Sequence, residues 1–277
     1  MVVVFDLNGT LLDTSALSKP LRSIFGRKVS VDHWFTAVLQ QAEAMTLGGD
    51  FREFGDLAAA VLKMLADGHG IAVKPEQIQA VRSAMLTMPA FTDVVPGLRR
   101  LQKAGHRLAV LTNSGRVSLA LQLQNAGLRE FFAQTLSVES VGLYKPAPEV
   151  YRFATEVMAA KPADMLMVAA HHWDLLAAAR RGYQTAFIRR PGRALLPGES
   201  RPTYVVDDLK QLADELAEKR SGQGHAHGST KVWGLVSSGI ALAAGIAALR
   251  LASGIEKRGE SQSNRQPNEE LSQRALV

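Results

Sequence analysis

The fold is decided by one stretch near the N-terminus, Val2-Val3-Val4-Phe5-Asp6-Leu7-Asn8-Gly9-Thr10-Leu11-Leu12. It opens with an unbroken apolar run, which is typical of a buried strand in a parallel sheet. A carboxylate, an amide, a glycine and a hydroxyl follow within five residues. Ligands bind at the carboxyl ends of strands in open α/β sheets. We therefore predict that Asp6 is a nucleophile there, although an Asp at a strand end also serves as a simple turn cap.

Composition restricts the class of protein. The chain has 277 residues, of which 47% are hydrophobic, so it fits one large domain or a core with an inserted cap. Because it has no cysteine, disulfides, thiolate metal sites and a cysteine nucleophile are excluded, and a reducing compartment is favoured. The net charge is only +6 and the arginine pairs, such as Arg189-Arg190, are scattered, so we interpret them as solvated and expect no nucleic-acid binding. Met1 leads straight into the first strand, so no signal peptide is expected.

From residue 91 onward, apolar strand patterns alternate with helical patterns. Strands are predicted at 106–112, 135–138, 165–170, 185–188 and 204–206, with a final helix at 209–216. This alternation predicts an α/β fold with a parallel, doubly wound sheet. We assign residues 1–14 and 91–219 to this core.

Residues 15–90 show only helical spacing. In the clearest helix, Asp50 and Glu53 precede an apolar stripe that begins at Phe54, and Gly68 ends it. The segment is far longer than a normal loop between two α/β elements. We therefore predict an inserted all-helical cap, whose leucine and methionine stripes form its own core.

Three further strand ends carry polar side chains. Thr112 and Asn113 end one strand with a hydroxyl and an amide, which suit a carboxylate or phosphate oxygen. Lys145 precedes a helix that starts with a proline; such a lysine usually only meets solvent, but here it is placed to keep Asp6 ionised. His171 and His172 follow the 165–170 strand, but no third ligand stands at metal spacing, and we predict no metal site.

Taken in order, these motifs resemble the four motifs of the haloacid dehalogenase (HAD) superfamily across residues 1–219. The closer resemblance is to type II 2-haloacid dehalogenases. It rests on Lys145-Pro146-Ala147-Pro148-Glu149-Val150-Tyr151 and on Ala170-His171-His172-Trp173-Asp174. The superfamily's first motif carries two acids, and Asn8 replaces the second here. Phosphatases use that acid to protonate a departing alkoxide, whereas a halide leaves without a proton. Asn8 therefore favours the dehalogenase branch.

The resemblance implies a role for each residue. Asp6 is the nucleophile, and attack on the halogen-bearing carbon gives an aspartyl ester that water hydrolyses to a 2-hydroxy acid. The substrate is then a 2-haloacid or a similar small organic acid. The catalytic set is Asp6, Lys145 and Asp174, and the expected substrate-binding residues are Asn8, Thr10, Thr112, Asn113, Tyr151, His171, Trp173 and Trp34. Tyr151 and Asp174 help to order Lys145 and the hydrolytic water. No cofactor is expected; Mg²⁺ is expected only for a phosphatase, which pairs two acids where this chain has only Asp174.

The chain departs from the branch at two places. Dehalogenases of this branch carry an arginine beside a tryptophan on the early cap helix, and this arginine helps to receive the halide. Here Trp34 is followed by Phe35, and no arginine lies between residues 28 and 51. The fourth motif has Ala169 and His171 in place of small hydroxyl and amide residues. We therefore consider His171, Trp173 and the cap face near Trp34 as alternative halide receivers.

The C-terminal part changes in composition. Residues 220–231 are rich in Gly, His and Ser and are predicted to be a linker. Residues 232–252 are predicted to form a hydrophobic transmembrane helix, because 232–249 contain no charge, although an Ala-rich soluble helix remains the alternative. Residues 253–277 are polar and predicted to be disordered. The catalytic domain is then expected in the cytoplasm, tail-anchored in a membrane.

Three functions remain open at this point. The first is a 2-haloacid dehalogenase. The second is a HAD-type phosphatase acting on a small phosphate ester without the usual acid at position eight. The third is a non-catalytic, membrane-tethered binding module that keeps the fold. The sequence does not indicate the oligomeric state.

Overall fold

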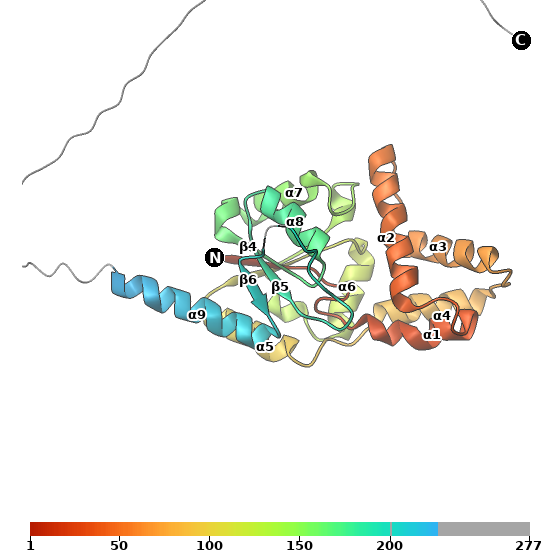
Figure 1. The fold of residues 1–277 in the computed structure, drawn as a ribbon, viewed down its shortest axis with the longest axis horizontal. Helices are drawn as coiled ribbons and strands as arrows, with labels where there is room; N and C mark the ends of the chain where they lie inside the picture. The colour runs from red at the N-terminus through yellow and green to blue at the C-terminus, as the bar shows by residue number, and fades with distance from the viewer. Residues whose placement is uncertain (200, 227–277) are drawn as a thin grey trace, which may run out of the picture. The chain divides into compact units, whose positions relative to one another are not determined.

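The computed structural model describes residues 1–199 and 201–226. Its core is a parallel sheet of six strands in the order β3-β2-β1-β4-β5-β6 (Figure 1). The strands are β1 (Val2–Phe5), β2 (Arg107–Thr112), β3 (Gln134–Ser137), β4 (Met165–Ala169), β5 (Gln184–Ile188) and β6 (Tyr204–Val206). The prediction of a parallel α/β sheet from the alternating pattern is confirmed.

The central strand β1 pairs with β2 on one side and with β4 on the other. All its residues are buried, as its continuous apolar sequence requires for a strand covered on both faces. From β1 the chain moves outward to β2 and β3, and then returns to β4, β5 and β6 on the other side. The strand order therefore reverses between β1 and β4. Such a switch point opens a crevice at the carboxyl ends of the strands, and Asp6 directly follows β1 there.

Helices cover both faces of the sheet. On one face lie α7 (Pro148–Met158) and α8 (His172–Arg180), and on the other α5 (Val94–Lys103) packs against α9 (Leu209–Ala226) (Figure 1). The helix α6 (Arg116–Asn125) connects β2 to β3 and contacts both β3 and the inserted helices. Short 3-10 helices η2 (Arg129–Phe131), η3 (Val138–Ser140) and η4 (Pro162–Asp164) complete the connections.

The segment between β1 and α5 is entirely helical. It contains η1 (Thr14–Leu17), α1 (Ser18–Phe25), α2 (Val31–Gly48), α3 (Phe54–Gly68) and α4 (Pro75–Leu86), which lie together beside the core in Figure 1. Pro20 is tolerated in α1 because it lies in the first turn, where its missing N–H has no helical acceptor. The chain leaves and re-enters the core through an antiparallel bridge between Leu12 and Ala90. We call this helical segment the cap.

The end of the core differs from the sequence prediction. The last helix was predicted at 209–216, with a linker from 220, but α9 continues to Ala226, so residues 220–226 are helical. Gly222 and Gly224 each cost a helix about 1 kcal/mol, which is too little to end a helix that Leu212 and Leu216 bury against the core. The remaining linker (227–231), the predicted transmembrane helix (232–252) and the tail (253–277) lie outside the described residues. Within residues 1–199 and 201–226, no helix combines the length and hydropathy needed to cross a membrane.

Candidate active site

Asp6 lies at the centre of a buried polar cluster at the switch point. Its side chain is only 7% exposed. Oδ1 accepts a hydrogen bond from Lys145 Nζ at 2.9 Å, and Oδ2 accepts one from Thr10 Oγ1 at 2.6 Å. The Nδ1 atom of His171 lies 3.0 Å from the same Oδ2. The structure thus brings together four residues that the sequence predicted for the site, from three separate segments.

Lys145 connects the two buried carboxylates. Its ammonium donates to Asp6 Oδ1 at 2.9 Å, to Asp174 Oδ2 at 2.7 Å and to the carbonyl oxygen of Leu111 at 2.9 Å. All three of its protons are therefore used. Burial alone lowers the pKa of Lys145, but the charges of Asp174 and Asp6 outweigh it and raise the pKa above its ordinary value. Lys145 is a permanent cation that holds both acids.

Asp174 is held from two sides. It is fully buried at the first turn of α8, and its Oδ1 accepts a hydrogen bond from the Tyr151 hydroxyl at 2.6 Å. Burial raises the pKa of Asp174, and the negative charge of Asp6 adds to this rise in spite of Lys145. Burial and the nearby Asp174 also raise the pKa of Tyr151 well above its usual range, so its hydroxyl remains a donor. Tyr151 therefore contacts Asp174, which in turn holds Lys145.

The two carboxylates have pKa values shifted in opposite directions. Burial would raise the pKa of Asp6, but the charge of Lys145, with the contacts of His171 and Thr10, holds it well below its usual range. Asp6 is therefore the ionised member of the pair, while Asp174 binds a proton more readily. Two acids with separated pKa values are a common arrangement where one is a nucleophile and the other a base.

Thr10 and Asn8 hold the loop after β1 in place. Thr10 Oγ1 donates to Asp6 and accepts from the backbone N–H of Ala170 at 3.0 Å, so it connects the ends of β1 and β4. The amide of Asn8 donates to Ser114 Oγ at 3.0 Å and accepts from Gln122 Nε2 at 3.1 Å. Asn8 therefore contacts the end of β2 and α6, and both ends of its amide are already paired.

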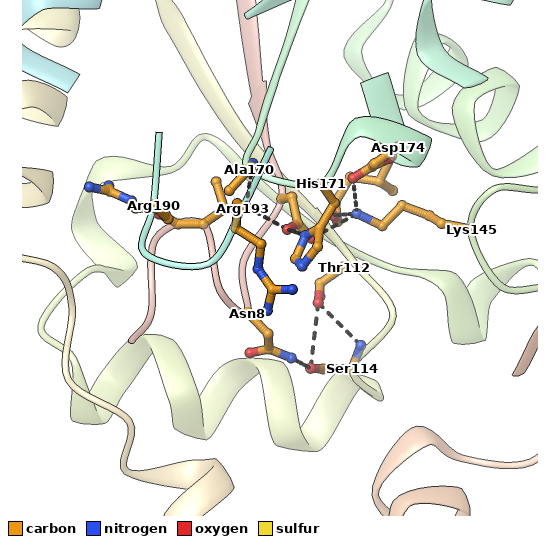
Figure 2. Close-up of polar contacts among 12 residues, drawn as sticks. Asn8, Thr112, Ser114, Lys145, Ala170, His171, Asp174, Arg190 and Arg193 are labelled. Carbon is orange, nitrogen blue, oxygen red and sulfur yellow. Dashed lines mark hydrogen bonds and ion pairs between the residues drawn. The ribbon is translucent and has the colours of Figure 1, made fainter. Parts of the chain in front are cut away.

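The end of β2 is also tied to the cluster. Asn113 Oδ1 accepts from the backbone N–H of Lys145 at 3.0 Å, and Thr112 Oγ1 accepts from the backbone N–H of Ser114 at 3.2 Å. Both side chains are buried beside the predicted site. Ser114, which the sequence analysis did not select, accepts from Asn8 (Figure 2). The signal was present, because Ser114 is the third polar residue in the same strand-end run.

Aromatic rings fix His171 between the cap and the core. His171 is 6% exposed; its ring stacks on Phe35 with centroids 6.3 Å apart, and Trp173 lies at 5.5 Å. Trp34 does not reach this place, contrary to the prediction. It is fully buried inside the cap, where its indole N–H donates to the carbonyl oxygen of Ala58 at 3.3 Å. Adjacent residues of a helix point about 100° apart, so Phe35 and not Trp34 faces the site.

Two arginines after β5 were not predicted to contribute. Arg190, interpreted as solvated, is buried: it donates to the carbonyl oxygen of Thr10 at 2.9 Å and forms a bidentate ion pair with Asp93 at 2.8 and 3.1 Å. Arg193 forms an ion pair with Asp32 of α2 at 3.1 Å and extends toward the loop after β1 (Figure 2). The sequence carried no signal for either contact, because both partners are remote in the chain.

The donor set does not fit a magnesium site. Among residues 1–199 and 201–226, no group of three His, Asp or Glu side chains is arranged to hold a metal ion. Both oxygens of Asp174 already accept hydrogen bonds from Lys145 and Tyr151. A cation beside Asp174 would also meet the ammonium of Lys145 at close range.

The fold and the cluster define a capped α/β protein with a buried Asp–Lys–Asp arrangement at its switch point. Residues 1–182 match the haloacid dehalogenase-like hydrolases, and the chain belongs to this family, in the branch that resembles 2-haloacid dehalogenases. The resemblance inferred from the motifs is confirmed.

Curated relatives and solved structures agree with this assignment. The (S)-2-haloacid dehalogenase of Pseudomonas fluorescens is 27% identical over 77% of this chain and 95% of its own length. The (S)-2-haloacid dehalogenase 1 of Pseudomonas sp. strain CBS-3 is 30% identical over 68% and 83%. The crystal structure of the L-2-haloacid dehalogenase RSc1362 superposes with a TM-score of 0.73, at 25% identity over 78% of this chain and 98% of that chain.

Proposed function

We propose that the protein hydrolyses the carbon–halogen bond of a small 2-haloacid to give halide and a 2-hydroxy acid. One observation carries the proposal. The ionised Asp6 is fixed by Lys145, while the amide of Asn8 is turned to Ser114 and Gln122 and offers no proton to an alkoxide leaving group. Similarity to proteins named (S)-2-haloacid dehalogenases supports the same activity.

The hydrogen bonds of Asp6 indicate which oxygen attacks. Oδ1 has one donor, Lys145, whereas Oδ2 is contacted by Thr10 and His171. Oδ1 therefore keeps a lone pair for the substrate. In the first step the bond from Oδ1 to the halogen-bearing carbon forms as the carbon–halogen bond breaks, and the bonding electrons leave with the halide.

The same contacts serve the second step. Oδ2 becomes the carbonyl oxygen of the ester, and Thr10 and His171, at 2.6 and 3.0 Å, are placed to stabilise the oxyanion that forms when water attacks Cγ. Asp174 takes a proton from the water. When the intermediate collapses, Oδ1 leaves as the hydroxyl of the product with a proton from Lys145, and Asp174 returns its proton to Lys145. Asp6 now carries the oxygen of water and releases one proton to solvent.

Substrate binding is assigned to the end of β2. The Oδ1 atom of Asn113 is used by the backbone N–H of Lys145, so its Nδ2 is the atom left to donate to the substrate carboxylate. Thr112 lies beside it in the same run. We therefore keep both residues as the proposed carboxylate site.

Oxygen labelling tests the proposed function. The protein is incubated with 2-chloropropionate in H₂¹⁸O; chloride release and the mass of the peptide that contains Asp6 are measured, with Lys145→Ala as a variant that traps the ester. We expect chloride release and ¹⁸O in Asp6 after several turnovers. Phosphate release from a panel of phosphate esters without halide release would favour the phosphatase alternative. Neither activity, and no adduct on Asp6, would favour a binding module.

We further propose that residues 232–252 anchor the protein in a membrane, with the catalytic domain in the cytoplasm. The support is from the sequence alone: eighteen residues without charge, between Lys231 and Arg250. Membrane sedimentation of the full chain, compared with a variant that ends at Ala226, tests this. Recovery of the full chain in the soluble fraction would contradict the anchor.

A further inference from the structure

Two side chains closely approach Gly9, three residues after Asp6. A Cβ atom placed on Gly9 would lie 3.2 Å from Cε1 and 3.5 Å from Nε2 of His171, and 3.8 Å from Nη2 of Arg193. Two nitrogen-bearing side chains, from the end of β4 and from the loop after β5, therefore lie near the same glycine. The φ of Gly9 is +76°, a conformation that also favours glycine.

His171 has an unpaired ring nitrogen near Gly9. Its Nδ1 lies 3.0 Å from Asp6 Oδ2, and its ring is held between Phe35 and Trp173. Its Nε2, on the other side of the ring, is buried and has no hydrogen-bond partner in the part of the chain that the structure describes. Buried polar atoms are nearly always paired in folded proteins. The geometry therefore calls for a ligand atom at Nε2.

Arg193 is a cation with unused capacity at the same place. Among residues 1–199 and 201–226 its ion-pair partner is Asp32, whose side chain is 65% exposed, whereas that of Arg193 is 18% exposed. Such a pair is screened by water and binds weakly, and a guanidinium has five N–H donors. Arg190, in contrast, is fully engaged with Asp93 and Thr10.

Arg193 lines two cavities that are large enough for small ligands. One, of about 350 Å³, is lined by Phe35, His171, Trp173 and Arg193. The other, of about 400 Å³, is lined by Gly9, Asp32 and Arg193. Arg193 therefore lines both cavities, together with His171 in one and with Gly9 in the other.

We propose that Arg193 and His171 receive the departing halide at the cavity of about 350 Å³ that both side chains line; this inference rests on the proposed function. The attacked carbon lies about 3 Å from Asp6 in a reactive complex, and the halogen is one bond further away. Nδ1 of His171 lies 3.0 Å from Asp6 Oδ2, and Nε2 lies on the other side of the ring. In this role Nδ1 of His171 faces Asp6 and Nε2 faces the halide. The weakly hydrated guanidinium of Arg193 suits a large monovalent anion. This cation comes from a core loop and not from the cap.

Two independent measurements test the proposal. The first is broadening of the ³⁵Cl NMR line of chloride by the resting full-length protein, which needs no turnover. The second is single-turnover mass spectrometry with 2-chloropropionate, which separates ester formation on Asp6 from ester hydrolysis. The variants are Arg193→Ala, Arg193→Lys and His171→Asn, which keeps an atom at the δ position and removes Nε2. Arg189→Ala is the matched control, because Arg189 lies in the same loop and pairs with the exposed Asp207.

We expect Arg193→Ala to abolish the broadening and to slow ester formation about 10- to 100-fold, as for one lost charge-assisted hydrogen bond, with little change in ester hydrolysis. Arg193→Lys should restore part of both readouts, His171→Asn should weaken the broadening, and Arg189→Ala should match the wild type. Asp32→Asn should keep or strengthen chloride binding, because it removes a negative charge and leaves Arg193 in place.

Three results would overturn the proposal: broadening that persists in Arg193→Ala, equal slowing of both chemical steps, or an Asp32→Asn variant that behaves like Arg193→Ala. The last result would show that Arg193 only connects the core to the cap through its ion pair with Asp32. If the wild type broadens chloride through Arg193 but forms no ester on Asp6, the anion site stands and the proposed dehalogenation fails. The two failures are therefore distinguishable.

Discussion

Two parts of the site are built differently. The first, which we call the floor, consists of Asp6, Lys145 and Asp174; the second, which we call the roof, consists of Arg193, Asp32 and His171, where the cap meets the core. On the floor, the side chains of Asp6, Lys145 and Asp174 are 7%, 1% and 0% exposed, and their charges pair with each other. On the roof, where the cap meets the core, the Arg193–Asp32 pair is partly exposed and Nε2 of His171 is unpaired. The floor is a fixed arrangement of charges that sets the reaction. The roof keeps hydrogen-bonding groups that are unpaired or only weakly paired, so we expect the substrate and the halide to bind there.

Removing the central carboxylate should have the largest effect on activity. Asp6→Asn keeps the shape of the side chain but removes the nucleophile, and we expect halide release to fall about 10⁴-fold or more. Asp13→Asn is the matched control: Asp13 lies seven residues on and caps η1 by accepting from the backbone N–H of Ser15 at 2.8 Å. Equal losses in the two variants would show that the effect is structural.

Removing the central cation should have the largest effect on stability. Lys145→Met leaves two buried carboxylates without a counter-charge, and we expect the free energy of unfolding at neutral pH to fall by about 3–5 kcal/mol. Urea denaturation measures this. Because the loss comes from uncompensated charge, adding Asp174→Asn to Lys145→Met should recover part of it. Strictly additive losses in the double variant would contradict the charge argument.

The floor also predicts a pH dependence. The pKa of Asp6 lies well below its unfolded value in the folded protein, so the folded state is favoured above the unfolded pKa, and this contribution is lost as pH falls toward the folded pKa. The stability difference between wild type and Asp6→Asn should therefore shrink as pH is lowered from about 5 to 3. Chemical denaturation at each pH measures it. A difference that stays constant over this range would exclude the low folded pKa.

The same contrast explains what the sequence could predict. The floor was found because its residues stand in short contiguous motifs that follow strands, and parallel strands bring these segments to the same edge of the sheet. The roof was not. Trp34 and Phe35 are neighbours in the chain, and only the packing of α2 decides which ring faces His171. Arg190 and Arg193 bind Asp93 and Asp32, which are 97 and 161 residues away. No local pattern encodes such pairs.

A smaller effect is expected from adding a methyl group at Gly9. Gly9→Ala places a methyl group 3.2 Å from the His171 ring in a backbone with φ of +76°. Gly49→Ala is the control, because Gly49 has φ of +74° and no atom within 4 Å of its Cβ position. Both should lose about 1–2 kcal/mol of stability from backbone strain. Only Gly9→Ala should also lose activity, by about tenfold for a displacement of roughly 1 kcal/mol at the site. Equal activity in the two variants would show that the surroundings of Gly9 do not contact the substrate or the halide.

The smallest effect is expected where the cap contacts the core at α6. Oε1 of Glu53 accepts from the backbone N–H of Gly115 at 3.2 Å and from Ser118 Oγ at 3.3 Å, at the N-terminus of α6. Oε2 of Glu53 also accepts from the backbone N–H of Asp56 at 3.1 Å, so Glu53→Gln leaves one acceptor oxygen for the two sites and removes the charge that the N-terminus of α6 favours. We expect the contact between the cap and α6 to weaken by about 0.3–1 kcal/mol. Because the contact holds cap to core and not the core itself, the loss should appear as faster amide exchange at Gly115 and a higher KM, with unchanged global stability. Glu76→Gln, an equal charge change in the exposed first turn of α4, should change neither readout. If both variants lowered global stability and left amide exchange at Gly115 unchanged, Glu53 would not connect the cap to α6.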